Sequence, residues 1–230
     1  MIKDNLNIVE QNITNAANRA NRDIKDVNLI AVSKTKPVSM LKEAYDAGAR
    51  DFGENKVQEI MDKYDKLPSD IRWHMIGHLQ TNKVKYIADK VYMIHSVESE
   101  KLAIEINKHA LKVGRVIPVL VEVNIGNEDS KFGVAPEDVI DFVEKISVYP
   151  GLQIQGLMTV APYTPNAEDN RVYFKKMKEL SVDITQKNID NVLMNVLSMG
   201  MTGDYEVAIE EGANYVRVGT GIFGERNYMI

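Results

Sequence analysis

The sequence predicts an α/β protein whose strands and helices form a closed (β/α)8 TIM barrel with one extra helix at the N-terminus. Three observations predict this fold. Short apolar segments alternate with helical patterns eight times along the chain. The joints between them are short and polar, which implies parallel strand pairing. The 230 residues fit one domain of this size. An open, doubly wound sheet is the alternative, because short strand–helix patterns alone do not show closure.

The predicted elements follow one another without a linker. Residues 4–21 form the leading helix, because their apolar residues recur on one face. The extended segments are 29–33, 51–53, 72–76, 91–95, 116–125, 152–158, 193–198 and 215–218. The helical patterns between them are 39–47, 56–64, 82–89, 98–113, 136–148, 168–186 and 205–211. Gly48, Gly114 and Gly212 closely follow such patterns, where glycine commonly ends a helix. We therefore predict a single domain over residues 1–230.

Composition excludes several classes of function. The net charge is -5 and the basic residues are scattered, which argues against a nucleic-acid-binding protein. The chain has no cysteine, so disulfides, thiolate catalysis and thiolate-bound zinc are excluded. The N-terminal segment is polar and no apolar run approaches the length of a membrane span. We expect a soluble cytoplasmic protein that does not bind a membrane.

Lys34 is the most informative single residue. It follows the buried segment 29–33, and Pro37 then stops the strand before a helical pattern begins. Desolvation at a strand end should lower the pKa of this lysine from about 10.4. A neutral amine attacks carbonyl groups and can form a Schiff base. The competing interpretation is an ordinary lysine that bends out to solvent.

In a closed barrel the C-terminal ends of all strands meet at one mouth, and a phosphate site commonly follows strands 7 and 8. Two glycine-bracketed segments lie there, at residues 198–204 and 218–221. Small residues let backbone N–H groups point at an oxyanion, and hydroxyl groups add donors. The residues expected around this mouth are Lys34, Asn55, His74, Gly77, His78, Lys131, Met158, Thr159, Ser198, Met199, Gly200, Arg217, Gly219 and Thr220.

A Schiff-base lysine, a phosphate cradle and an arginine together suggest pyridoxal 5'-phosphate as the cofactor. The aldehyde would bond to Lys34, and Arg217 would face the pyridine nitrogen. A guanidinium has only donors, so it pairs with an unprotonated ring nitrogen. That pairing weakens the ring as an electron sink and disfavours carbanion chemistry. The alternative for Arg217 is a structural ion pair.

Several blocks of sequence, in order, resemble one known family. These blocks are residues 31–37, 52–59, 73–83, 123–125, 130–133, 156–159, 197–204 and 217–226. They are similar to the YggS-type pyridoxal phosphate homeostasis proteins, and the resemblance covers essentially the whole chain. Thr202 is one departure, since the family more often has serine there, but a hydroxyl group is retained.

The resemblance implies a barrel similar to the N-terminal domain of alanine racemase, with Lys34 carrying the aldimine and Arg217 meeting the ring nitrogen. It also implies a phosphate site and ring-side contacts, with Lys131 as a second cofactor-handling lysine. The remaining cofactor-binding residues would be Ser198, Gly200, Gly219 and Thr220 for the phosphate, and Asn55 for the ring. Apart from the resemblance, the eleven methionines are interpreted as core filler, with Met199 as a further candidate contact to the cofactor. The family is known for vitamin B6 and amino-acid homeostasis, with no established turnover.

We expect storage or delivery of the cofactor rather than catalysis. Racemisation requires one base on each face of the substrate. In alanine racemase the second base is a tyrosine on an added β domain, presented across a dimer. This chain ends at Ile230, which leaves no room for that domain. We therefore predict a monomer with an open cofactor face and no catalytic residues, which exchanges cofactor with apo forms of pyridoxal phosphate-dependent enzymes.

Three other functions remain open from the residues. The first is a cofactor-dependent amino-acid racemase, for which Tyr163 is the best candidate second base. The second is a Schiff-base aldolase whose glycine turns hold a sugar phosphate. The third is a regulatory module that acts through partner proteins.

Four polar residues also have a structural interpretation. His74 and His78 are four residues apart, but a core or loop position is favoured over a metal site. For Asn55 the competing interpretation is the N-cap of the helix that follows it. Lys36 reads as a surface lysine.

Overall fold

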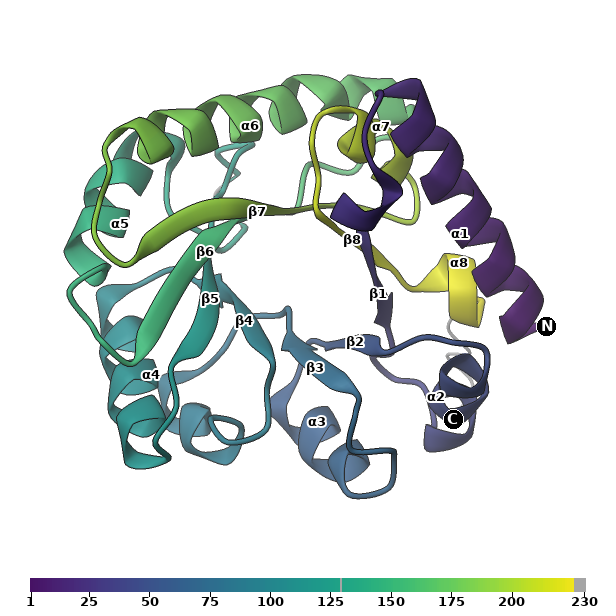
Figure 1. Ribbon diagram of the computed structural model, residues 1–230, viewed down its shortest axis with the longest axis horizontal. Coiled ribbons are helices and arrows are strands. Elements are labelled where there is room, and N and C mark those ends of the chain that lie inside the picture. The colour runs from purple at the N-terminus through teal and green to yellow at the C-terminus, as the bar shows by residue number, and fades with distance from the viewer. Residues whose placement is uncertain (129, 226–230) are drawn as a thin grey trace.

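The computed structural model describes residues 1–128 and 130–225. Eight parallel strands form a closed barrel in sequential order, and β8 pairs with β1 to complete the ring (Figure 1). The predicted barrel is confirmed, and the open-sheet alternative is wrong. The strands are β1 (Asn28–Val32), β2 (Asp51–Glu54), β3 (Arg72–Met75), β4 (Met93–Val97), β5 (Ile117–Glu122), β6 (Leu152–Met158), β7 (Val192–Met201) and β8 (Tyr215–Val218).

Helices surround the barrel, and the predicted N-terminal helix is present. The α-helices are α1 (Ile2–Arg19), α2 (Val38–Asp46), α3 (Val57–Tyr64), α4 (Glu100–Lys112), α5 (Val139–Ile146), α6 (Arg171–Gln186), α7 (Tyr205–Glu210) and α8 (Thr220–Phe223). The 3-10 helices are η1 (Ile24–Asp26), η2 (Thr81–Tyr86), η3 (Pro136–Asp138) and η4 (Ala167–Asn170). Helix α1 lies along α7 and α8 on the outside of the barrel (Figure 1).

Several elements differ from the sequence prediction, and three of these differences have a clear physical reason. The expected helix over 82–89 is the 3-10 helix η2, of which only Val84 is buried, so it has no continuous apolar face. Strand β7 continues to Met201, beyond the predicted end at 198, because Met201 pairs with Arg217 across a register shift. Helix α8 was not predicted, since four residues are too few to show a helical period.

The barrel has two apolar layers because side chains alternate along each strand. The outer layer packs the strands against the helices and includes Phe52, Trp73 and Leu157. The smaller inner layer lies within the barrel. It consists of Ile30, Met93, Leu120, Met158, Val196 and Tyr215, with Val160 packed against it. Polar side chains in phase with this inner layer therefore face the barrel axis.

Gly156 allows β6 and β7 to approach closely. The pairing register shifts next to it, between Ile154 and Gly156. A Cβ atom at this position would overlap with the carbonyl oxygen of Val196. Only glycine fits there, because no side chain can be accommodated between these two backbones.

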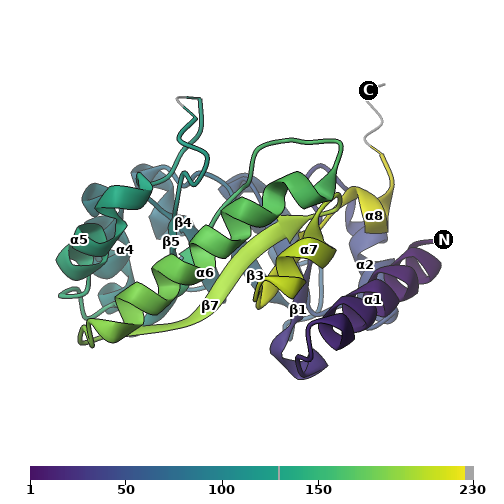
Figure 2. The ribbon, with the colours of Figure 1, turned by 90° about the horizontal axis from the view of Figure 1, so that it is seen from above.

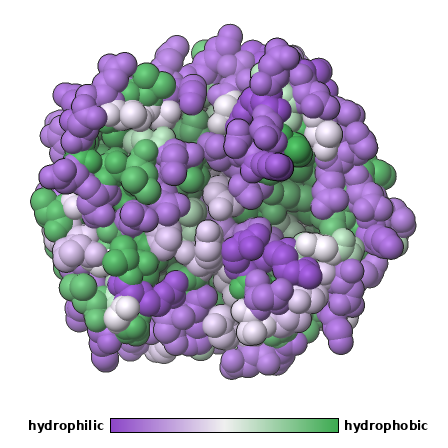
Figure 3. Space-filling view, in the orientation of Figure 1, coloured by the Kyte–Doolittle hydropathy of each residue, from purple (hydrophilic) through white to green (hydrophobic). Residues whose placement is uncertain are grey.

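The outer surface is mostly polar. Hydrophilic residues predominate on the face seen in Figure 3, and hydrophobic residues there form separate patches. Within residues 1–128 and 130–225, no helix combines the length and the apolarity that crossing a bilayer requires.

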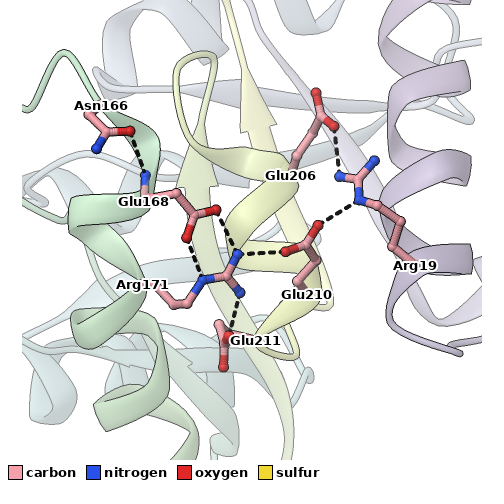
Figure 4. A network of polar contacts seen from close by, with 7 residues as sticks. All are labelled: Arg19, Asn166, Glu168, Arg171, Glu206, Glu210 and Glu211. Atoms are coloured by element: carbon pink, nitrogen blue, oxygen red, sulfur yellow. Dashed lines mark hydrogen bonds and ion pairs between the residues drawn. The ribbon is translucent and has the colours of Figure 1, made fainter.

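A partly exposed set of ion pairs on the outer surface joins α6, α7 and α1 (Figure 4). Arg171 binds three carboxylates, and Arg19 at the end of α1 binds two. Glu210 accepts from both arginines, at 2.7 Å in each case. We call this set the surface network. It consists of Arg19, Glu168, Arg171, Glu206, Glu210 and Glu211.

Candidate functional site

The predicted site residues gather at the C-terminal mouth of the barrel. Ala31 pairs with Val218, so the residues that follow β1 and β8 lie side by side. An ideal Cβ on Gly219 would lie 3.4 Å from the Cβ of Val32, which confirms this proximity. Figure 2 shows that α8 and the loops after β5 and β6 are on the same side of the barrel. Lys34 is half-buried and continues the inward phase of Ile30.

The backbone on both sides of Lys34 is fixed by charged groups. The Ser33 hydroxyl donates to Glu54 Oε1 (2.6 Å), and Lys63 Nζ donates to the Ser33 carbonyl oxygen (3.0 Å). After Lys34, the N–H of Thr35 donates to Glu59 Oε2 (2.6 Å). Thr35 adopts a positive φ of 63°, an uncommon conformation for a β-branched residue. Lys34 therefore sits on a tightly determined turn.

The carboxyl group of Glu54 lies beneath this turn and is completely buried. Burial raises its pKa to about 7, although Lys63 Nζ at 2.7 Å and the Ser33 hydroxyl act in the opposite direction. Glu59 behaves differently. Burial alone would raise its pKa, but bonds from Thr35 and Lys63 outweigh burial and leave the pKa lowered. The lowered pKa expected for Lys34 itself stays a prediction.

Lys36 is not the free surface lysine that the sequence suggested. It is half-buried, and its Nζ donates to the carbonyl oxygens of Phe223, Gly224 and Glu225 at 3.1, 3.0 and 3.0 Å. These carbonyls are at the C-terminal end of α8, where cations are favoured by the unpaired oxygens. The contact ties the Lys34 loop to the helix that begins at Thr220.

The two predicted glycine turns meet through Thr202. The N–H of Gly219 donates to Thr202 Oγ1 (3.3 Å), and the Thr220 hydroxyl donates to the same oxygen (3.2 Å). Gly200 has a positive φ of 90°, and a Cβ there would come within 2.6 Å of the Ala208 Cβ. Glycine at this position lets α7 pack directly against the end of β7. The Thr202 hydroxyl therefore joins both turns, a role that the sequence alone did not indicate.

Arg217 is inside the barrel, just below these turns, with 4% of its surface exposed. Its Nη1 donates to Ser198 Oγ (2.6 Å) and its Nη2 donates to the Thr159 carbonyl oxygen (2.7 Å). Burial lowers its pKa to about 10, with Glu122 and Asp204 partly opposing the shift, so the guanidinium stays protonated at neutral pH. Within the described part of the chain, no carboxylate lies within ion-pair distance of it, so the predicted alternative of a structural ion pair is wrong.

Ser198 and Met199 are placed differently from the other predicted site residues. The Ser198 hydroxyl is fully buried and bonds to Arg217 and to His95 Nδ1 (3.0 Å) rather than to the glycine turns. The Met199 side chain packs in the outer apolar layer. Because both side chains are engaged elsewhere, these residues can face a ligand at the turns only through their backbones.

A continuous line of polar contacts runs down the barrel from Arg217. His95 Nε2 lies 2.9 Å from His74 Nδ1, and His74 Nε2 lies 2.9 Å from Asp51 Oδ1. Arg72, whose side chain is 44% exposed, donates to both oxygens of Asp51. We call this line the interior chain. It consists of Arg217, Ser198, His95, His74, Asp51 and Arg72. The preferred core position of His74 is confirmed, whereas His95 and Asp51 were not recognised.

The charges of the interior chain follow from burial. Burial is the largest influence on both histidines and lowers their pKa values, that of His95 well below its usual range. Both rings are therefore neutral at pH 7. Burial alone would raise the pKa of Asp51, but hydrogen bonds from His74 and Arg72 outweigh it, and the pKa is lowered. Asp51 is therefore ionised.

A cavity of about 490 Å³ opens beside the mouth and is lined by Asn55, His78, Glu122 and Lys131, among others. Glu122 was missed in the sequence, although it follows Leu120 in the inward phase of β5. Burial, and next Glu98, raise its pKa to about 7, and its Oε2 has no hydrogen-bond partner among the described residues. This carboxyl group is an unused acceptor or donor at the mouth.

The other residues around this cavity are partly engaged. Lys131 Nζ lies 2.7 Å from Glu128 Oε1 and donates to the Ala161 carbonyl oxygen (3.2 Å). Asn55 is half-buried and precedes α3, but the N-cap of that helix is Lys56, so the N-cap interpretation of Asn55 is wrong. His78 is a loop histidine that pairs with Glu98 and stacks on Phe132.

Comparison with known proteins agrees with this arrangement. Residues 5–227 match the family of the alanine racemase N-terminal domain. The chain is 46% identical to the pyridoxal phosphate homeostasis protein of Aquifex aeolicus over 226 residues, covering 98% of both chains. It is 39% identical to the protein of that name from Haemophilus influenzae, covering 99% of this chain and 97% of the relative. Among solved structures, PipY of Synechococcus elongatus with pyridoxal phosphate bound superimposes with a TM-score of 0.82 at 33% identity, covering 97% of this chain and 100% of PipY. The chain therefore belongs to the pyridoxal phosphate homeostasis family and has the fold of the alanine racemase N-terminal domain.

Proposed function

We propose that this protein binds pyridoxal 5'-phosphate at the barrel mouth, through a Schiff base on Lys34, and stores or delivers the cofactor inside the cell. One observation carries the proposal. A lysine on a rigid turn, two joined glycine turns and a buried guanidinium lie at the adjacent ends of β1, β7 and β8. The bound cofactor in PipY, a relative over the full length, supports the same assignment.

The residues present fit each part of this cofactor. A phosphate requires N–H and hydroxyl donors, and the proposed donors are the turns at Gly200, Gly219 and Thr220. The Gly219 N–H and the Thr220 hydroxyl, which donate to Thr202 in this structure, would turn to the phosphate when it binds. The amine of Lys34 condenses with the aldehyde and one water is released. A guanidinium has five N–H groups, and the two bonds to Ser198 and Thr159 leave Arg217 further donors for a ring nitrogen.

Asn55 is proposed to contact the ring from the side of β2, because it lines the cavity at that edge of the mouth. Ser198 and Met199 would contribute backbone groups, since their side chains are engaged elsewhere. Lys131 lies across the same cavity and is proposed as a second lysine that handles the cofactor as it enters or leaves.

We propose binding without turnover because the tyrosine that would serve as the second base is not held at the site. Tyr163, the candidate for that role, is 95% exposed in the loop after β6. A base must reach the proton that it removes, and an exposed tyrosine with no fixed position does not meet that requirement. We further propose a cytoplasmic monomer whose recipients are apo forms of cofactor-dependent enzymes, a role that is compatible with the homeostasis named in its relatives.

The test is an absorbance spectrum of the purified, cofactor-loaded protein before and after borohydride reduction, followed by mapping of the modified peptide. We expect a visible band that reduction abolishes and a modified peptide containing Lys34. Lys34→Ala should remove the band and leave the fold intact, whereas Lys42→Ala, an exposed lysine on the following helix α2, should retain it. A modification mapped to another lysine would contradict the proposal.

Turnover is tested separately, by incubating the loaded protein with single enantiomers of several amino acids. We expect no steady racemisation. Turnover that Lys34→Ala abolishes would show that the protein is a racemase.

A further inference from the structure

The interior chain has an unusual property for a barrel core. It places two imidazole rings, a hydroxyl and a carboxylate in a space that apolar side chains fill at the neighbouring positions. Burying a polar group is unfavourable unless it is hydrogen-bonded, so such a line of groups is retained only when every member has a partner. Here each successive pair lies within 3.0 Å.

The two ends of the interior chain determine the direction in which its hydrogen bonds donate. Arg217 has no acceptor, so it must donate to Ser198, and ionised Asp51 has no donor, so it must accept from His74. With neutral rings, only one arrangement satisfies every pair. The Ser198 hydroxyl donates to His95 Nδ1, His95 Nε2–H donates to His74 Nδ1, and His74 Nε2–H donates to Asp51. The reverse arrangement would place a bare His74 nitrogen against a carboxylate at 2.9 Å.

This direction of hydrogen-bond donation determines which acceptors face the Arg217 guanidinium. The Ser198 proton is committed to His95, so the serine oxygen can only accept from the guanidinium. The Thr159 carbonyl oxygen is the second acceptor, and the Thr159 N–H in turn donates to the Ser198 carbonyl oxygen at 3.1 Å. Because both acceptors are fixed, the planar guanidinium of Arg217 is held in one plane and at one rotation angle.

We propose that Asp51, His74, His95 and Ser198 are positioning residues, which orient the Arg217 guanidinium toward the cofactor ring. They do so through hydrogen bonds that all donate in the same direction, from Arg217 toward Asp51. The inference rests on the proposed function for what Arg217 faces, but the interior chain itself is independent of any ligand. The lower end is anchored by Arg72, which binds Asp51 from the opposite end of the barrel. A residue far from the mouth is thereby linked to the cofactor site.

The first test uses the cofactor-free wild-type protein. Nitrogen NMR of 15N-labelled histidine side chains distinguishes the two neutral tautomers and the cation, and single substitutions assign the four rings. We expect His74 and His95 to be neutral and protonated at Nε2, without titration between about pH 6 and pH 8. A ring protonated at Nδ1, or a cationic His74, would overturn the single direction of the chain.

The second test asks whether the chain orients Arg217 in the loaded protein. His95→Leu removes both bonds of the ring, whereas His95→Gln retains one acceptor and one donor. We expect the Leu variant to shift the visible absorbance band in the same direction as Arg217→Glu and to weaken cofactor binding, and the Gln variant to restore the band at least in part. Tyr215→Phe is the matched control, because its ring packs against both histidines but its hydroxyl is not part of the chain.

An unchanged band in a folded His95→Leu variant, or an equal shift in Tyr215→Phe, would overturn the positioning role. If the His95→Leu variant does not fold, the histidine tautomers in the wild-type nitrogen spectrum still show whether the hydrogen bonds of the interior chain run in one direction. If the wild-type protein takes up no cofactor, the proposed function fails while the tautomers of the two rings remain measurable. The two failures are therefore distinguishable.

Discussion

The interior chain and the surface network both contain arginines and carboxylates but serve different purposes. Both join arginines to carboxylates across several elements of the fold. In the surface network, Glu210 is shared by Arg19 and Arg171, and each arginine has more than one carboxylate to bind. In the interior chain each group has a defined partner and the donors run in one direction. Shared partners allow rearrangement, whereas single partners fix an orientation.

Energetics separate the two regions further. Exposed ion pairs contribute about 0.2–1 kcal/mol each, because water screens them and long side chains lose freedom. Removing one member of a buried polar set costs about 3–5 kcal/mol, since the remaining group loses both water and its partner. Four substitutions test whether the two regions differ in this way.

Asp51→Ala should have the largest effect, with a loss of about 3 kcal/mol in the free energy of unfolding. It leaves the buried His74 Nε2–H without an acceptor and the Arg72 guanidinium without its carboxylate. Urea unfolding at neutral pH measures the loss, and Asp51→Asn, which retains an acceptor, should lose less. A loss below about 1 kcal/mol for the Ala variant would show that the interior chain behaves like a surface set.

His95→Gln should change how stability depends on pH. Burial holds the pKa of His95 well below its ordinary value of 6.5, so the unfolded state binds more protons than the folded state just below that pH. The ring's contribution is fully present above pH 6.5 and is lost as the pH falls toward the folded pKa. Relative to wild type, the variant should therefore gain stability as the pH falls below about 6.5, the ordinary pKa of histidine.

The informative quantity is the difference in unfolding free energy between wild type and His95→Gln at each pH. Glu54 and Glu122 have pKa values raised to about 7, so their contribution to stability falls as the pH rises from about 4.5 toward 7. This opposite dependence is present in both proteins and cancels in the difference. Parallel stability curves for wild type and His95→Gln would contradict a buried neutral ring at this position.

Arg171→Ala tests the surface network and should cost about 1 kcal/mol, because the side chain is 26% exposed and binds three carboxylates. Most of that loss should disappear in about 1 M salt, where charges are screened over about 3 Å. The loss in Asp51→Ala should persist under the same conditions. Equal salt sensitivity of the two variants would remove the distinction between the regions.

Arg19→Ala should have the smallest effect, about 0.5 kcal/mol, since half of its side chain is exposed. It sits at the C-terminal end of α1, where a positive charge is mildly stabilising. A double-mutant cycle with Arg171→Ala measures how strongly the two arginines couple through Glu210. A coupling energy larger than either single loss would show that the surface network acts as one rigid unit.

Much of the fold was predictable because it depends on local patterns. Strand β8 has the predicted bounds, and the alternation of strands and helices correctly indicated a closed barrel. The Lys34 turn and the glycine turns were also predicted, since strand ends in a barrel converge on one mouth. Elements shorter than one helical period, such as α8, carry no such signal.

The interior chain was not predictable in the same way because its members come from five strands. His95 was taken as the end of the segment 91–95, whereas β4 continues to Val97 and the ring lies in the middle of the strand. Its pairing with His74 depends on the register between β3 and β4, which the sequence does not state. One signal was available, since Asp51 and Glu122 are acidic residues in the inward phase of buried strands.

The contact between Lys36 and the end of α8 has a consequence for how a ligand is held. The Lys36 ammonium group donates hydrogen bonds to three carbonyl oxygens. The loop that carries Lys34 and the turn that begins α8 are therefore joined before any ligand binds. Binding then requires little ordering of the protein, and preorganisation of this kind strengthens affinity by reducing the entropic penalty. In the proposed complex, release of the cofactor would further require hydrolysis of the Schiff base on Lys34, which suits the proposed role in storage or delivery.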